Sequence, residues 1–443
     1  MAEKALFNQG EICLYDLDRS RSETMGRLLM KTPEYGAIDC RITWPASLDR
    51  ALEGADAVAV ILAPGSALLN ELQSSACDRH GFLPSDNVSP TGALLGVKAS
   101  GLFLDLARKM ERHCPQAWLL DFVNPIAVLS GMVNRHSKIR ALGLCAGFAN
   151  HMWDLSRILG RDAMRHDIEV DVAGVNHLSF IVGGKIGGKD LLRQIDRAVG
   201  PKWKMCPLGD NWSAGAKAGI TRSVTHLVDL YRRLGVLIFS TEGDGMAHLE
   251  YEETLAAHQQ NLKIKTKAQV ESHLRKWRKE RAAKNVWFAS HLDRDLDAAF
   301  WKAQYPTDIF GRAGDDIFLR VLRGIAGIEK VRIASSRLNG GAIEGLPDDA
   351  VCEYSQFLHR QTIEPTGRYR IPPVAHGLIS GLALHQTMLA DACATGDPRL
   401  LALALQAYPI RPYSPALRNL FKELIKIGRS DFPKSLQKTD AYL

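Results

Sequence analysis

The fold class is decided by WLLDFVNP at residues 118–125, an apolar run that ends in an asparagine and a proline. A run that is apolar on both faces is typical of a strand buried inside a parallel sheet. The amphipathic stretch GLFLDLARKMERHCP at 101–115 precedes it and AVLSGMVNRH at 127–136 follows it, both with helical spacing. We therefore predict helix, strand and helix in succession, the unit that builds a doubly wound α/β sheet.

The same alternation extends in both directions. ADAVAVILA at 55–63 and IRALGLC at 139–145 are further buried strands, and ICLYD at 12–16 is a short strand followed by a helix. Past residue 180 the strict alternation ends, and long helical stretches are expected over 215–330 and again over 374–428. We predict a Rossmann-like doubly wound parallel sheet in residues 1–165. Residues 166–443 are expected to form a mixed α+β C-terminal domain.

The start of the predicted dinucleotide-binding half is unusual. In that fold the first strand leads into a GxGxxG loop, and an acidic residue ends the second strand ~20 residues later. Asp16 fits that acid, as an acceptor for the ribose hydroxyls of NAD, but only Gly10 precedes it, and residues 1–9 suit the tail of a crossover helix. The first strand and its glycine loop are thus expected to be missing. Three readings stay open: the recorded start lies inside a longer gene, the protein lacks the pyrophosphate cradle, or Asp16 is a plain surface aspartate.

Composition favours a globular enzyme. Of the 443 residues 46% are hydrophobic and 24% charged, and no apolar run approaches the ~20 residues of a membrane span. The N-terminus lacks the pattern of a signal peptide, and the eight cysteines are scattered without a CxxC pair, which favours a cytoplasmic location. The net charge of +7 is mild, and its densest run, at 263–284, is expected to be a solvated helical face. We predict no nucleic-acid or membrane partner.

Four polar residues follow the predicted strands, where open α/β sheets build their ligand sites. They are Asn124, Cys145, Asn176 and His177. A thiolate and an imidazole suit a first-row divalent metal with open positions, and carboxamides bind sugar hydroxyls. Each also has a plain structural reading, as a buried cysteine, a core histidine or a turn-capping asparagine.

The order of these motifs resembles glycoside hydrolase family 4, the NAD- and divalent-metal-dependent glycosidases of the α-glucosidase, α-galactosidase and 6-phospho-glucosidase type. The matching strings are LEGADAVAVILAPG, the stretch from SPTG to NP, GLC, GVNH, and LNGGAIEGLPDDAVCEY at 338–354. The resemblance implies a C-terminal domain of the lactate dehydrogenase and family 4 type. It also implies NAD and manganese as cofactors, a small glycoside as substrate, and a homodimer or homotetramer.

The resemblance also implies a reaction. NAD takes a hydride from the sugar C3, a base removes the acidified C2 proton, a metal stabilises the enediolate, and the C1 leaving group is eliminated. Cys145 and His177 become the metal ligands, Asn124 a cofactor and substrate contact, and Asn176 a substrate contact. The base is Tyr251 or Asp244 in STEGDGMAHLEYEE at 240–253, where His248 is a further metal-site candidate. The alternative for this stretch is a solvated helix.

Two positions depart from the family pattern. Ala146 follows Cys145 where many members carry a polar residue, and Val123 replaces a hydroxyl residue before Asn124. A methyl group donates no proton, which leaves three alternatives. The leaving group of the substrate needs no general acid, His151 serves as the acid in place of residue 146, or the site has lost activity. Neither an anomer nor a 6-phosphate is assigned. An inactive or binding-only relative and a lactate/malate-type dehydrogenase remain as alternatives.

Overall fold

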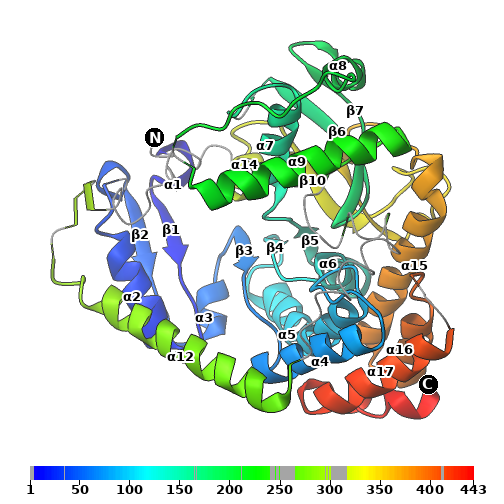
Figure 1. Ribbon diagram of the computed structural model, residues 1–443. Helices are drawn as coiled ribbons and strands as arrows, with labels where there is room; N and C mark the ends of the chain where they lie inside the picture. The colour runs from blue at the N-terminus through cyan, green and yellow to red at the C-terminus, as the bar shows by residue number, and fades with distance from the viewer. Residues whose placement is uncertain are drawn as a thin grey trace.

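The computed structural model describes residues 4–443 except 34, 164, 166, 211, 240–244, 246–248, 250–264, 295, 298, 301–316 and 411–413. Their centre is a ten-stranded mixed sheet, drawn in Figure 1. Its path runs β3 (Ala57–Val60), β4 (Trp118–Asp121), β5 (Arg140–Gly143), β10 (Val331–Leu338), β11 (Val351–His359), β6 (Ile168–Val175), β7 (Leu178–Ile186) and β8 (Lys189–Asp190). Beside this path, β12 (Thr362–Pro365) pairs with β11 and β9 (Leu237–Ile238) with β7.

The parallel half of this sheet confirms the predicted fold class. β3, β4 and β5 are parallel and in continuous register, and all four residues of β4 are buried. Helices α4 (Ala67–Arg79) and α5 (Pro90–His113) lie between β3 and β4 in the chain, and α6 (Ile126–His136) lies between β4 and β5. The structure therefore confirms the alternation of buried strands and amphipathic helices that the sequence around WLLDFVNP predicts.

One residue pair joins the parallel half to the antiparallel half. Ser336 of β10 faces Gly143 of β5, and from there β10, β11, β6 and β7 continue the sheet in antiparallel pairs. A Cβ at Gly143 would lie 2.3 Å from Ile126 Cγ2 and 2.9 Å from Ser336 Cβ, so only glycine fits where the two halves meet. The sheet thus continues past residue 165, and the division of the chain there stays a prediction.

The first two strands form a sheet of their own. β1 (Gly10–Cys13) and β2 (Cys40–Thr43) are parallel and linked by α2 (Arg19–Leu29), and α3 (Leu48–Leu52) leads from β2 to β3. Among the described strands, β1 pairs only with β2 and β3 only with β4, and Figure 1 shows β2, β1, β3, β4 and β5 in that order. A doubly wound sheet has the order 3-2-1-4-5-6. The described residues therefore leave its central position without a strand.

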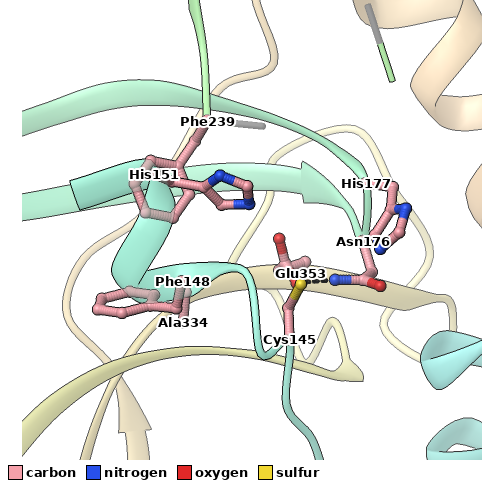
Figure 2. Close-up of a pocket in the computed structure, with 8 residues that line it drawn as sticks. All are labelled: Cys145, Phe148, His151, Asn176, His177, Phe239, Ala334 and Glu353. Atoms are coloured by element: carbon pink, nitrogen blue, oxygen red, sulfur yellow. Dashed lines mark hydrogen bonds between the residues drawn. The ribbon is translucent and has the colours of Figure 1, made fainter. Parts of the chain in front are cut away.

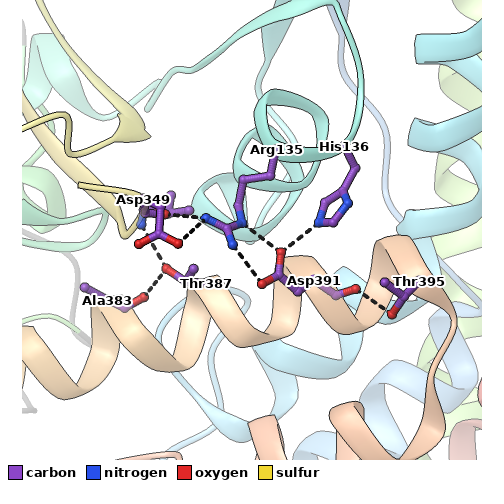
Figure 3. Close-up of polar contacts among 8 residues, drawn as sticks. Arg135, His136, Asp349, Ala383, Thr387, Asp391 and Thr395 are labelled. Carbon is purple, nitrogen blue, oxygen red and sulfur yellow. Dashed lines mark hydrogen bonds and ion pairs between the residues drawn. The ribbon is translucent and has the colours of Figure 1, made fainter. Parts of the chain in front are cut away.

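Three C-terminal helices support the parallel half: α15 (Pro373–Thr395), α16 (Pro398–Gln406) and α17 (Ser414–Gly428). Their presence confirms the helices predicted over 374–428. Arg135 at the end of α6 forms a two-pronged ion pair with Asp391 of α15, with N–O distances of 2.7 and 2.9 Å (Figure 3). His136 contacts the same carboxylate at 2.7 Å, and Arg135 also reaches Asp349. Such paired charge-assisted contacts fix α6 against α15.

The remaining described helices are α1 (Lys4–Phe7), α7 (Phe148–Ile158), α8 (Leu191–Ala198), α9 (Ala214–Leu234), α12 (Lys267–Ala289) and α14 (Ile317–Ile325). Most side chains of α12 are exposed, which confirms that the basic run is a solvated helical face. α12 contacts both α2 and α4, so it spans from the small sheet to the large one (Figure 1). In the described part of the chain no helix is long and apolar enough to cross a membrane.

Candidate functional site

A cavity, called the site cavity here, lies where β5, β6, β10 and β11 meet. Figure 2 shows the side chains around it, which come from segments far apart in the sequence. They are Cys145, Phe148, His151, Asn176, His177, Phe239, Ala334 and Glu353.

The two predicted metal ligands line this one cavity. Cys145 follows β5 and starts the turn into α7, where its carbonyl accepts a 3.2 Å hydrogen bond from the Phe148 N–H. Asn176 and His177 form the two-residue turn of the β6–β7 hairpin, and His177 has a left-handed φ of 67°. Positive φ is usual in such tight hairpin turns. The hairpin thereby directs the imidazole to the cavity that the thiol also lines.

A network of three asparagines runs beside the cavity. Asn87 Nδ2 donates to Asn176 Oδ1 at 2.6 Å and to Asn124 Oδ1 at 3.0 Å. Asn176 Nδ2 donates in turn to Glu353 Oε2 at 2.8 Å. The amide of Asn176 is therefore held from both ends, and the network connects it to Asn124.

Glu353 anchors this network from the middle of β11. It is buried, and its second oxygen accepts a 2.8 Å hydrogen bond from Ser179 Oγ. Burial raises the pKa of the Glu353 carboxyl, while the hydrogen bonds from Asn176 and Ser179 oppose that rise. Because both donors point at its oxygens, the carboxyl fixes which way the Asn176 amide faces.

The start of α5 packs closely against the Asn87 loop. Ser89 caps α5 by accepting from the Gly92 N–H, and the Asn87 carbonyl accepts from the Ser89 N–H at 2.9 Å. A Cβ at Gly92 would lie 2.0 Å from that carbonyl oxygen, so the helix approaches the loop as closely as a glycine allows. Asn87 Oδ1 is buried and has no hydrogen-bond partner among the described residues.

Aromatic rings close the other side of the cavity. Phe239 makes edge contacts with Phe148 and His151, with centroid distances of 5.6 and 5.2 Å. Burial, together with the nearby His177, lowers the pKa of His151 to about 3. At neutral pH the His151 imidazole is then uncharged and holds no imidazolium proton to give to a leaving group.

The donor set fits a divalent metal. The Cys145 thiol and the His177 imidazole line the same cavity as Asn176, and sulfur and imidazole nitrogen are ligands of first-row metals. Within the described ranges no group of three or more His, Cys, Asp or Glu side chains is placed to hold a metal ion. As far as the described residues go, a metal on Cys145 and His177 would keep positions open for further ligands, as catalytic metals do.

The residues fit NAD only in part. Asp16 follows β1, where its Oδ1 accepts a 2.9 Å hydrogen bond from the Asp18 N–H and its Oδ2 lies 3.9 Å from Arg21. That place at a strand end suits a ribose contact. The glycine turn that would cradle the diphosphate belongs to the central strand, which the described residues do not supply. They therefore offer no complete dinucleotide site.

The structure brings together four of the predicted site residues and places Asp16 outside the cavity lining. Cys145, His177 and Asn176 line the cavity, and Asn87 links Asn124 to them. Asp16 is not among the residues that line the cavity. The candidates Tyr251, Asp244 and His248 lie outside the described residues.

Sequence reasoning missed Asn87 and Glu353. A carboxylate within the apolar run AVCEY could have marked Glu353 as a buried, hydrogen-bonded group. Asn87 sits in a loop of turn-forming residues and carries no comparable signal.

Comparison with known proteins decides the family. The family 4 glycosyl hydrolase model matches residues 2–161, and the model of the C-terminal domain of that family matches residues 172–410. The chain belongs to the family 4 glycosyl hydrolases. Membership of this family makes the chain a glycosidase. It favours a glycoside hydrolase over the lactate/malate-type dehydrogenase that the sequence left as an alternative.

This family 4 glycosyl hydrolase is similar to curated proteins over nearly its whole length. It is 23% identical to an alpha-galacturonidase of Thermoanaerobacter italicus, covering 95% of this chain and 90% of the relative. It is also 23% identical to a probable 6-phospho-beta-glucosidase of Bacillus subtilis, covering 97% and 92%.

Solved structures show the same fold. A 6-phospho-alpha-glucosidase from gut microorganisms, in complex with NAD and Mn2+, matches with a TM-score of 0.77 and 17% identity over 96% of this chain and 92% of its own. A putative glucosidase of Bacillus subtilis matches with a TM-score of 0.74 and 21% identity, covering 94% and 92%.

Proposed function

We propose that this family 4 glycosyl hydrolase cleaves a small glycoside at the site cavity, with a divalent metal, manganese by resemblance, on Cys145 and His177 and with NAD as its second cofactor. The observation that supports it is the shared cavity. A thiol after β5 and an imidazole in the β6–β7 turn, far apart in sequence, line the same cavity beside a fixed carboxamide. The similarity to an alpha-galacturonidase and to a probable 6-phospho-beta-glucosidase is a reason to include a galacturonide and a 6-phospho-glucoside, both anionic, in a substrate panel.

The residues of the chain have distinct parts in this proposal. Cys145 and His177 hold the metal, whose charge would stabilise an oxyanion formed on the sugar. Asn176 and Asn124 present amides whose orientation Asn87 and Glu353 fix. NAD supplies a hydride acceptor, and no residue is assigned to hold its diphosphate. Tyr251 and Asp244 stay candidates for the base.

Among the described residues, neither Ala146 nor His151 can give a proton to a leaving group beside the proposed metal. Ala146 is exposed next to Cys145 and donates no proton, and His151 is uncharged at neutral pH. We therefore expect glycosides of an activated phenol, such as p-nitrophenol, to be cleaved much faster than alkyl glycosides of the same sugar. The comparison is made by turnover of matched pairs with manganese, NAD and a reductant present.

The first test of the metal site is a titration of the protein with Mn2+, in which electron paramagnetic resonance measures how much of the metal is bound. Cys145→Ser and His177→Ala are each expected to weaken Mn2+ binding by at least about 10–100-fold, the usual cost of losing even a supporting contact. Cys206→Ser is the matched control, because Cys206 is also a free, partly buried cysteine but does not line the cavity. Equal Mn2+ affinity in all four proteins would refute the metal site.

A second candidate is a relative that binds sugar or nucleotide without turning over. Two observations favour this candidate. Ala146 donates no proton, and the described residues leave the doubly wound sheet without its central strand. Retention of a glycoside by the protein, without product from any activated glycoside, would support this candidate against the enzyme.

Assembly and location are also proposals. We expect a homodimer or homotetramer, which light scattering coupled to size exclusion measures directly. All eight cysteines are free, as in proteins of a reducing compartment, and a cytoplasmic location stays a prediction.

A further inference from the structure

A half-buried arginine outside the site cavity has no acidic partner. Arg337 lies near the end of β10, and its Nε is buried without a hydrogen-bond partner among the described residues. Burial lowers the pKa of Arg337; Tyr354 opposes that effect and the nearby Arg140 adds to it. None of the described carboxylates forms an ion pair with either arginine. Two positive charges thus lie close together without a compensating negative charge from the described chain.

Three other arginines with little exposed side chain show the usual arrangement, in which each contacts two carboxylates. They are Arg135 with Asp349 and Asp391, Arg157 with Asp154 and Asp162, and Arg332 with Glu169 and Asp171. Between 6% and 20% of each of these three side chains is exposed. Removing a charge from water is costly unless an opposite charge is close. Because Arg337 departs from this arrangement, its position calls for an anion.

Arg337 and Arg140 flank one indole ring. Trp118 begins β4 and pairs in register with Arg140, the first residue of β5. The Cζ atoms of Arg140 and Arg337 lie 4.8 and 5.9 Å from the centroid of the Trp118 ring. Trp118 is fully buried, and its Nε1 donates to the Arg360 carbonyl at 3.2 Å, which fixes the ring. The two guanidinium groups are therefore placed by one rigid aromatic surface.

The register of the sheet directs both arginines to the same face. Ser336 of β10 is opposite Gly143 of β5. One position along, Arg337 is opposite Leu142, and the side chains of Leu142 and Arg140 share a face because successive side chains of a strand alternate. The pair lies toward the amino end of β5, whereas the site cavity begins after its carboxyl end. The two arginines therefore belong to a different place from the site cavity.

The chemistry of this pair selects its ligand. Arg140 is oriented by donating to the carbonyls of Gln116 and Gln361, at 2.9 and 3.2 Å. Guanidinium groups bind oxyanions through parallel N–H donors. A phosphate group carries nearly two negative charges at neutral pH and has oxygens for two guanidinium groups, which a single carboxylate lacks. We propose that Arg337 and Arg140 bind a phosphate group beside Trp118, as inorganic phosphate or as a phosphate monoester.

This inference goes beyond the proposed function and does not depend on it. Asn124 and Cys145 follow the carboxyl ends of β4 and β5, while the phosphate would bind near the amino ends of the same strands. The phosphate is therefore not a group of the glycoside in the site cavity. Because it binds only the folded chain, it would stabilise the two strands that lead to those site residues.

The test is a calorimetric titration of sodium phosphate into the full chain at pH 8 and constant ionic strength, without NAD, metal or glycoside. Wild type should bind phosphate saturably, and Arg337→Met at least about tenfold more weakly. Arg165→Met is the matched control and should bind like wild type, because Arg165 is also half-buried but already pairs with Asp167. Titration with glycerol phosphate identifies the source: binding of both supports a phosphorylated metabolite, and binding of phosphate alone supports the free ion.

Urea unfolding separates a phosphate site from simple packing of Arg337 on Trp118. Without phosphate, Arg337→Met should have a higher urea midpoint than wild type, because it removes an unpaired charge and keeps an apolar contact with the ring. Saturating phosphate should raise the midpoint of wild type but not that of Arg337→Met. If Arg337 only packs on the indole, Arg337→Met will instead have the lower midpoint, and phosphate will change neither protein.

Three results would overturn the inference. They are no saturable binding of phosphate by wild type, equal affinity in wild type and Arg337→Met, and acetate binding as tightly as phosphate. The first would mean that a carboxylate of this chain or of a second copy is the partner of Arg337. Because the assay contains no metal, cofactor or glycoside, none of these results bears on whether the chain is a glycosidase.

Discussion

Replacing Gly92 with alanine tests whether the close approach of α5 to the Asn87 loop holds the asparagine network together. The new Cβ would lie 2.0 Å from the Asn87 carbonyl oxygen and 2.6 Å from its carbon, and both are backbone atoms. The loop must then move by roughly 1 Å, and overpacking of this kind costs about 1–3 kcal/mol. If the two Asn87 hydrogen bonds are lost as well, about 0.5–1.5 kcal/mol is added for each.

Gly101→Ala is the matched control, because Gly101 is exposed on the same helix and a Cβ there would lie 4.0 Å from Pro433 Cγ, an ordinary contact distance. It should stabilise the protein by up to about 1 kcal/mol through helix propensity. If both Asn87 hydrogen bonds are lost, we expect the free energies of unfolding of the two variants to differ by roughly 2–7 kcal/mol, measured by urea unfolding with tryptophan fluorescence. Mn2+ affinity should fall only in Gly92→Ala. A Gly92→Ala protein as stable as wild type would refute the reasoning.

Three further predictions concern buried or paired charges. Glu353→Gln puts an amide against the Asn176 and Ser179 donors, so Mn2+ affinity should fall about tenfold, whereas the exposed Glu364→Gln should change nothing; equal affinities would contradict the anchoring role. Burial opposes ionisation of Asp391, but Arg135 and His136 hold its pKa below the usual value, so its stabilising effect is present above about pH 4 and lost as pH falls further. The difference in urea midpoint between wild type and Asp391→Asn should therefore shrink in acid, and a constant difference would count against the pair. Burial lowers the pKa of Lys98 to about 8, so the unfolded chain binds more protons above that pH and stability should rise from pH 8 to 9.5. Lys98→Met should lose that rise, and an unchanged pH profile would show that Lys98 is not its source.

The parallel strands could be predicted because the pattern of apolar residues that marks a buried strand lies within each segment. WLLDFVNP and IRALGLC are apolar on both faces, and the strands Trp118–Asp121 and Arg140–Gly143 lie inside those runs. The strand Cys40–Thr43 was not predicted, because CRIT is short and alternates polar with apolar residues. Its pairing with β1 depends on a partner that local patterning does not reveal.

The candidate site was only partly predictable for a related reason. Cys145 and His177 stand at strand ends, so the rule for open sheets places them near a site. Asn87 and Glu353 both hydrogen-bond to Asn176, which lies 89 residues from Asn87 and 177 residues from Glu353 in the sequence. The contact of Glu353 follows from the antiparallel pairing of β6 with β11, which the sequence does not specify.

The single join between β5 and β10 has a consequence for synthesis on the ribosome. Its two residues, Gly143 and Ser336, are 193 positions apart (336 − 143). At about 5–20 residues per second, the ribosome needs roughly 10–40 s to deliver β10 after β5. During that interval the nascent chain carries β5 with one open edge, and it should engage chaperones that shield such edges. Slower translation between these two strands would lengthen that exposure without changing one residue of the finished protein.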